Sequence, residues 1–159
     1  MTAIFNNGVY DFAEAARFTG LKRSRVREWF RIRNAGPTRR AMFVSSYAPV
    51  DGKFAISFLD MIDVFVAGQL RDHGVTLQHL RKVYQSMRVG LNTEHPFSHR
   101  ELLSDGKKVF MRWEDEQGRH LLEEALTRQR AFPELLLPFL KRIDYDEASR
   151  LAKRWRIAE

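Results

Sequence analysis

The sequence predicts an α+β fold in two parts. Residues 1–89 are expected to form a winged helix-turn-helix with a helical pair, and residues 90–159 a small subdomain of helix and strand. Three features predict this: two short helical patterns separated by a glycine, two longer amphipathic patterns after them, and alternating apolar and polar residues in the last third. A chain of 159 residues is long enough to bury a core in one or two small domains.

The first short helix has clear sequence boundaries. Asp11 can cap it, and Glu14, three residues later, completes a capping box in which each side chain accepts from the other residue's backbone N–H. Gly20 stands where the helix has to stop and turn, a position where a positive φ costs glycine little.

The second short helix, in the segment KRSRVREWFR, has two chemically different faces. Its apolar face comprises Val26, Trp29 and Phe30. Beside Ser24, an i, i+4, i+8 stripe on another face comprises Arg23, Arg27 and Arg31. One guanidinium group can donate two hydrogen bonds at once to phosphate oxygens or to a guanine edge. The pattern therefore predicts a DNA-reading helix that continues to Asn34. The alternative is a solvated basic surface helix.

The positive charge is concentrated in the N-terminal third. The whole chain carries +7, and residues 1–50 hold nine Lys and Arg against three Asp and Glu, a net charge of +6. Such a local field attracts phosphate groups and makes their binding salt-dependent. No helical pattern combines a basic face with a broad exposed apolar one, so the predicted partner is nucleic acid rather than a membrane surface.

A hairpin is predicted directly after the second helix. Ala41–Tyr47 and Lys53–Ile56 have the composition of short strands, and Asp51-Gly52 between them favours a hairpin turn. A hairpin in this position is a wing, and basic residues at its base can touch phosphates: Arg33, Arg39 and Arg40. The alternative is an ordinary loop with scattered charges.

Two amphipathic helices are predicted next, as core support for the helix-turn-helix. The first begins at the cap-like Ser57–Asp60, and its apolar stripe is Leu59, Ile62, Val66 and Leu70. The second is capped by Thr76, and its apolar side is Leu77, Leu80, Val83, Tyr84 and Met87. We interpret Asp60 and Asp63 as part of a helix start rather than as a catalytic pair.

The remainder is expected to form a separate unit. Residues 89–99 are predicted to be a polar linker, with His95 and His99 on its surface. Asp105-Gly106 predicts a hairpin between Arg100–Ser104 and Lys107–Trp113, and a compact helix is predicted near residues 133–144. Tyr145–Glu159 fits both an edge strand and a helix docked by its tryptophan.

The order of helix-turn-helix, wing and a helical pair ending LRDHGVTLQHLRKV resembles the DNA-binding head of MerR-type regulators. In that family the second helix reads the major groove and the wing grips flanking phosphates. Lys22 stands where that family usually has a Ser or Thr cap, and no cysteine sensor is present, so metal sensing is not implied. The candidate DNA-binding residues are Lys22, Arg23, Ser24, Arg25, Arg27, Arg31, Arg33, Arg39, Arg40 and Lys53.

Over nearly its whole length the chain is similar to VapB-type antitoxins that carry a MerR-like N-terminal domain. The similarity rests on YDFAEAARFTGL, ISFLDMIDVFVAGQLRDHGVTLQHLRKV, HPFSHRELLSDGKKVF and the final DYDE…LAKRWR. It implies a transcriptional regulator that binds double-stranded DNA as a homodimer, its own promoter included, and a toxin protein as a further partner.

Other function classes find less support in the residues. The absence of cysteine excludes disulfides and thiol catalysis. No apolar run approaches the roughly 20 residues of a membrane span, so the sequence predicts a cytoplasmic protein. No catalytic motif or metal-ligand spacing rises above chance, so neither an enzyme nor a cofactor is predicted. The alternative function is an interaction module in which residues 100–159 sequester a toxin or other partner and DNA binding is secondary.

Overall fold

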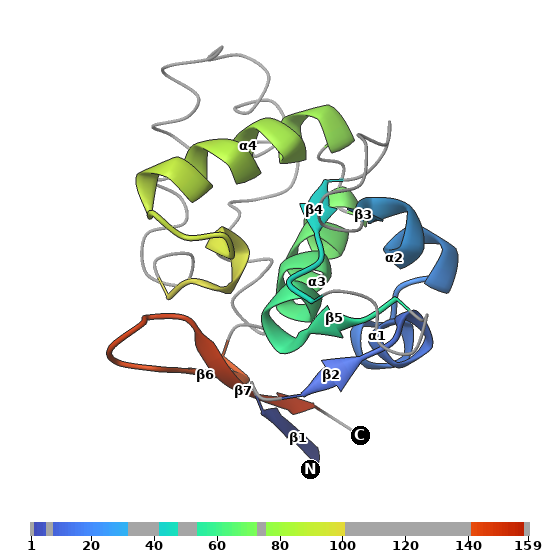
Figure 1. Ribbon diagram of the computed structural model, residues 1–159, viewed down its shortest axis with the longest axis horizontal. Helices are drawn as coiled ribbons and strands as arrows, with labels where there is room; N and C mark the ends of the chain where they lie inside the picture. The colour runs from blue at the N-terminus through green and yellow to red at the C-terminus, as the bar shows by residue number, and fades with distance from the viewer. Residues whose placement is uncertain are drawn as a thin grey trace.

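The computed structural model describes residues 2–5, 8–31, 42–47, 54–72, 76–100 and 141–157. Its central element is α3 (Phe58–Asp72), which α1 (Phe12–Thr19) and α2 (Arg23–Trp29) flank on one side (Figure 1). In the same view α4 (Leu77–Gly90) crosses the top and a small sheet lies at the bottom. The described residues therefore form a mixed α+β fold, as the sequence predicts.

The largest sheet joins the two ends of the chain. It contains β1 (Thr2–Phe5), β7 (Ala152–Ile157) and β6 (Ile143–Tyr145) in that order, all antiparallel. Of the two alternatives for the C-terminal segment, the strand is confirmed. It is a central strand rather than an edge strand, because β1 pairs with its other side.

The two strands predicted to form the wing pair with other partners. β4 (Phe43–Val44) lies parallel to β3 (Phe30–Arg31), and β5 (Ile56–Ser57) lies antiparallel to β2 (Val9–Tyr10). The predicted hairpin is therefore not formed by the described residues, and its Asp51-Gly52 turn lies outside them. Strand composition is a local property, whereas the partner of each strand is set here by burial of Phe43 and Ile56 in the common core.

The start of α3 is confirmed in detail. The Asp60 N–H donates to Ser57 Oγ at 3.0 Å, and the Ser57 N–H donates to Asp60 Oδ2 at 3.0 Å, which is a reciprocal capping box. Nearly every residue from Phe58 to Leu70 is buried, as expected for a helix that other elements surround. A Cβ on Gly68 would lie 2.6 Å from Leu21 Cδ2, so glycine allows the turn before α2 to approach this helix closely.

The C-terminal end of the predicted polar linker, residues 96–99, is part of the core, whereas its first residues are exposed or half-buried. α4 runs on to Gly90, and Pro96–Ser98 form a short 3-10 helix, η1. Phe97 is fully buried and its ring packs on Tyr84 at a centroid distance of 5.4 Å. His99 is buried as well, so the prediction that it lies on the surface is wrong. One apolar residue among polar ones is enough to anchor the segment, because burying Phe97 contributes about 2–3 kcal/mol.

A single hydrophobic cluster includes residues from both predicted parts. Trp155 of β7 packs on Phe65 of α3 with ring centroids 4.9 Å apart, and Ile143 of β6 belongs to the same cluster. The division of the chain at residue 89 stays a prediction. The predicted hairpin lies outside the described residues except for Arg100. Of the helix predicted near residues 133–144, only residues 141–144 are described, and they form a turn and the start of β6 rather than a helix.

Candidate functional site

α1 and α2 are two short helices joined by a tight turn at Gly20. Asp11 Oδ1 accepts from the Glu14 N–H at 2.8 Å, Glu14 Oε1 accepts from the Asp11 N–H at 3.3 Å, and the predicted capping box is confirmed. Gly20 has a φ of 77°, the left-handed conformation expected for a helix C-cap. The turn ends at Leu21, which is buried against α3.

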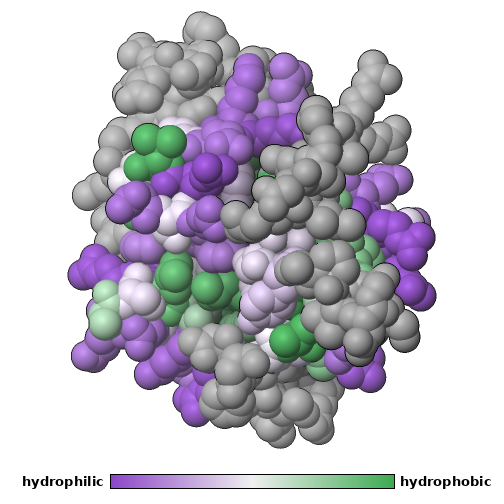
Figure 2. All heavy atoms as spheres, viewed as in Figure 1, coloured by the Kyte–Doolittle hydropathy of each residue, from purple (hydrophilic) through white to green (hydrophobic). Residues whose placement is uncertain are grey.

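α2 presents a hydrophilic face to solvent and an apolar face to the core. Val26 and Trp29 are buried, whereas the exposed residues of this segment are Lys22, Arg23, Ser24, Arg27 and Glu28. Hydrophilic residues gather in Figure 2 where Figure 1 places α2. None of the carboxylates in the described part of the chain pairs with Arg23 or Arg27, and both residues are exposed. The Lys22 side chain makes no capping hydrogen bond to α2.

Arg25 differs from its neighbours because it is held by the protein. Its Nη1 lies 2.7 Å from Asp72 Oδ1 at the end of α3, and its guanidinium lies 5.6 Å from the ring centroid of Trp29. The ion pair is partly exposed, so its contribution to stability is small. It ties α2 to the end of α3, so Arg25 is partnered within the protein rather than a free donor.

The third arginine of the predicted stripe is not on the helix. α2 ends at Trp29, and Phe30 and Arg31 form β3. The prediction that the helix continues to Asn34 is therefore wrong. The physical reason is Phe30, whose extended backbone places its ring in the core 5.3 Å from Phe43. The other predicted contacts lie outside the described residues: Arg33, Arg39, Arg40 and Lys53.

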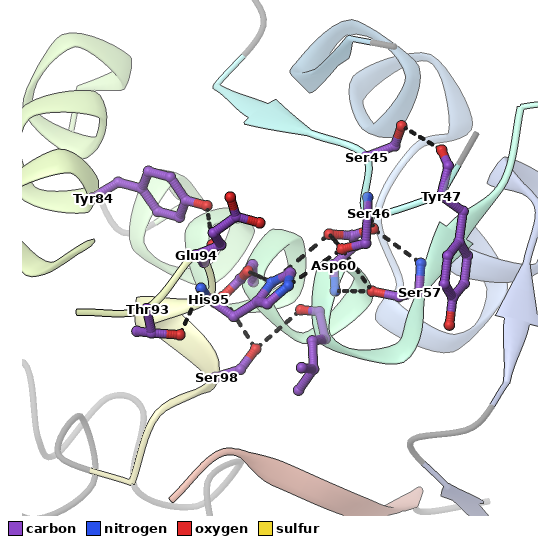
Figure 3. Close-up of polar contacts among 12 residues, drawn as sticks. Ser45, Ser46, Tyr47, Ser57, Asp60, Tyr84, Thr93, Glu94, His95 and Ser98 are labelled. Carbon is purple, nitrogen blue, oxygen red and sulfur yellow. Dashed lines mark hydrogen bonds and ion pairs between the residues drawn. The ribbon is translucent and has the colours of Figure 1, made fainter. Parts of the chain in front are cut away.

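A second group of polar side chains, which we call the polar network, joins α3, the segment after β4 and the segment that leads through η1. Its members are Ser46, Ser57, Asp60, Asp63, His95 and Ser98 (Figure 3). The side chains of Asp60 and Asp63 are 3% and 1% exposed, and that of His95 is 14% exposed. Carboxylates are almost never so deeply buried unless they are paired.

The distances within the polar network account for its burial. His95 Nδ1 lies 2.7 Å from Asp63 Oδ2, and its Nε2 lies 3.2 Å from Ser46 Oγ. Asp60 accepts from the Ser46 hydroxyl at 2.8 Å and from the Ser46 and Ser57 N–H groups at 2.8 Å and 3.0 Å. The prediction that His95 lies on the surface without a carboxylate partner is wrong.

The ionisation of the polar network is shifted by its surroundings. Burial raises the pKa of Asp63 to about 6, although the hydrogen bond from His95 opposes the shift. Burial lowers the pKa of His95, but the hydrogen bond and the charge of Asp63, with smaller contributions from Asp60 and Glu94, outweigh it and raise that pKa. Nearby, burial raises the pKa of Tyr84, whose hydroxyl donates to the Glu94 carbonyl at 2.7 Å.

Ser46 contacts His95, and His95 contacts Asp63, as the serine, histidine and aspartate of a nucleophilic triad do. A nucleophilic serine must pass its hydrogen to the histidine, however, and Ser46 donates to Asp60 at the shorter distance of 2.8 Å. The geometry suits a structural hydrogen-bond network better than acyl transfer. Within the described part of the chain, no group of three or more His, Cys, Asp or Glu side chains is arranged to hold a metal ion.

Sequence reasoning missed the polar network, although one signal was present. Asp63 stands in FLDMIDVFVAG, where apolar residues occupy almost every position around the helix. A carboxylate in a helix buried on all sides requires a partner. That signal predicts a partner for Asp63, but the partner lies 32 residues away at His95 and its identity depends on the tertiary fold.

Comparison with known proteins shows a likeness of fold to a solved structure. No protein-family model and no curated protein matches the chain. The crystal structure of Rv2018 from Mycobacterium tuberculosis superposes with a TM-score of 0.70, with 20% sequence identity. The match covers 90% of this chain and 66% of the Rv2018 chain. At that identity the likeness shows a shared α+β fold.

In the part of the chain that the structure describes, no helix is both long and apolar enough to cross a membrane.

Proposed function

We propose that this protein binds double-stranded DNA in a sequence-specific manner through the exposed face of α2, as a transcriptional regulator. One observation supports the proposal. A capped helix and a glycine turn precede α2, whose apolar side is buried, while Arg23 and Arg27 are exposed and have no partner among the described residues. Arg25, paired with Asp72, ties α2 to the end of α3.

The dimensions of α2 support insertion into a major groove. A helix with its side chains is about 10–12 Å in diameter, and the major groove is about 12 Å wide. Arg23 and Arg27 are one turn apart, a rise of about 6 Å along the helix, which is close to two base steps of about 3.4 Å each. The two guanidinium groups can therefore reach neighbouring guanine edges or phosphates at the same time.

A short reading helix makes few base contacts, so we propose that the protein acts as a homodimer on a pseudo-palindromic site. The similarity to VapB-type antitoxins makes the upstream region of its own gene the first duplex to test. Repression of that promoter, with a toxin protein as co-regulator, belongs to the same proposal.

The test is fluorescence anisotropy with the upstream duplex and a scrambled duplex over a range of salt concentrations. The variant Arg23→Ala/Arg27→Ala removes two charges from α2, and Lys82→Ala/Arg88→Ala removes two from the exposed side of α4 as a matched control. We expect the wild type and the α4 variant to prefer the upstream duplex and the α2 variant to lose that preference. Equal weakening by both variants would mean that net charge alone attracts DNA, and the proposal would fail.

A further inference from the structure

His95 occupies the point where three parts of the polar network meet. Its Nδ1 contacts Asp63 on α3, its Nε2 contacts Ser46 just after β4, and its backbone leads into η1 (Figure 3). β4 pairs with β3, which directly follows α2, and the Met42 N–H before β4 donates to the Trp29 carbonyl at 2.8 Å. The imidazole thus joins the end of the helix-turn-helix to the central helix.

Counting hydrogens in the polar network assigns the protonation state of His95. The single hydroxyl hydrogen of Ser46 points to Asp60 Oδ1 at 2.8 Å, so Ser46 Oγ can only accept from His95 Nε2 at 3.2 Å. While Asp63 is ionised, its carboxylate can only accept from His95 Nδ1 at 2.7 Å. With Asp63 ionised, both ring nitrogens therefore carry hydrogen, and His95 is an imidazolium between two carboxylates.

We propose that the imidazolium of His95 is a proton-dependent clamp that holds the segment after β4 on α3. When the Nε2 proton leaves, the Ser46 hydroxyl has to turn its hydrogen towards the bare ring nitrogen. Asp60 Oδ1 then loses its hydroxyl donor. The segment after β4 is consequently held by one hydrogen bond fewer. Asp60 Oδ1, which is buried, no longer accepts a hydrogen bond from Ser46.

The charged groups around His95 favour the protonated form. Asp60 and Asp63 face it from α3, and Glu94 precedes it on its own segment. From α4, Tyr84 faces the same carboxylates and Arg88 faces Tyr84. The two aspartates and Glu94 raise the pKa of His95 after burial has lowered it, which agrees with the count of hydrogens.

Asp63 supplies a second proton site in the same cluster. The Ser98 hydroxyl lies 3.1 Å from Asp63 Oδ1 and 3.0 Å from the Leu59 carbonyl oxygen, and its one hydrogen cannot satisfy both acceptors. A proton on Asp63 Oδ1 resolves the conflict, because Asp63 then donates to Ser98 and Ser98 donates to Leu59. Burial raises the pKa of Asp63 to about 6, so this proton is bound under mildly acidic conditions, where it removes the negative charge that faces His95.

The experiment uses the full chain and nitrogen-15 NMR of the histidine rings. We expect the His95 ring to titrate above about 6.5, the ordinary value for histidine, and so to carry hydrogen on both nitrogens in most molecules at pH of about 6.5. His99 serves as an internal reference in the same spectra. A single neutral tautomer of His95 at pH of about 6.5 would overturn the clamp.

Amide exchange of Ser46 measures the opening of the clamp. After correction for the intrinsic rate, the open fraction should rise about tenfold per pH unit up to the His95 pKa and then level off, because the neutral form grows in that proportion. In His95→Asn, whose amide keeps a donor near Asp63 but does not titrate, exchange should be fast and independent of pH. Exchange in the wild type that follows the intrinsic rate alone would overturn the proposal. So would a His95→Asn variant whose open fraction rises with pH as steeply as that of the wild type. If the variant fails to fold, the wild-type titration alone decides.

Discussion

Charged side chains occur in two contrasting regions of this protein, the exposed face of α2 and the buried polar network around His95. On α2, Arg23 and Arg27 lie in solvent without partners among the described residues, so their charge costs the fold little. In the polar network, each charge is removed from water and stays there because hydrogen bonds satisfy it. Charged side chains are therefore left exposed in one region and satisfied by internal hydrogen bonds in the other, according to burial.

The largest effect is expected from Asp63→Ala, which leaves the buried imidazolium without its partner. Removing one member of a buried ion pair costs about 3–5 kcal/mol of unfolding free energy. Urea unfolding at pH 7 measures it, and Asp72→Ala, which breaks a half-exposed ion pair, is the control. A loss below about 1 kcal/mol for Asp63→Ala would mean that the charges in this network are not coupled.

The next largest effect concerns DNA rather than stability. Replacing Arg23 and Arg27 by alanine should weaken binding to the specific duplex by about 2–4 kcal/mol. It should also reduce the slope of the logarithm of the binding constant against the logarithm of the salt concentration by about 2. The melting temperature should stay unchanged, because neither side chain packs in the core. Anisotropy titrations and calorimetry separate the two effects. If the variant binds the specific duplex as tightly as the wild type, α2 is not the element that reads the DNA sequence.

A smaller, pH-dependent effect separates the two regions further. The folded-state pKa of His95 is raised, so its stabilisation is complete below about 6.5 and disappears as the pH rises through the folded value. The pKa of Asp63 is also raised, and stability therefore falls as the pH rises from about 4 through 6. Melting temperatures of wild type and His95→Asn should converge as the pH increases above 6.5. Parallel curves would contradict this prediction.

An effect of about 1 kcal/mol is expected at the turn between α1 and α2. Alanine at Gly20 would be forced into a φ of 77° although no atom lies within 4 Å of its Cβ, so the loss comes from backbone strain alone. Gly90→Ala is the matched control, since Gly90 also has open space but no positive φ, and it should be neutral or stabilising. Equal melting temperatures for the two variants would contradict the left-handed turn.

The smallest effect should come from the Arg25–Asp72 pair. Arg25→Ala should cost about 0.2–1 kcal/mol of stability, because both side chains are partly exposed. Arg25→Lys keeps the charge but loses the planar group over Trp29, which reveals how much orientation matters for DNA binding. A double-mutant cycle with Asp72→Ala isolates the pair. A coupling energy above about 2 kcal/mol would show that α2 is held more rigidly than an exposed ion pair allows.

The sequence by itself determined the local features of this protein. The capping boxes at Asp11 and Ser57, the left-handed turn at Gly20 and the buried side of α4 depend on residues within four positions of each other, and the structure confirms them. Only the tertiary structure decided the remaining features. α2 ends at Trp29 because the next residue packs against Phe43, and His95 is buried because Asp63 lies opposite it. These contacts join residues 13 and 32 positions apart, and pairing at such separations depends on the folded core rather than on any local pattern.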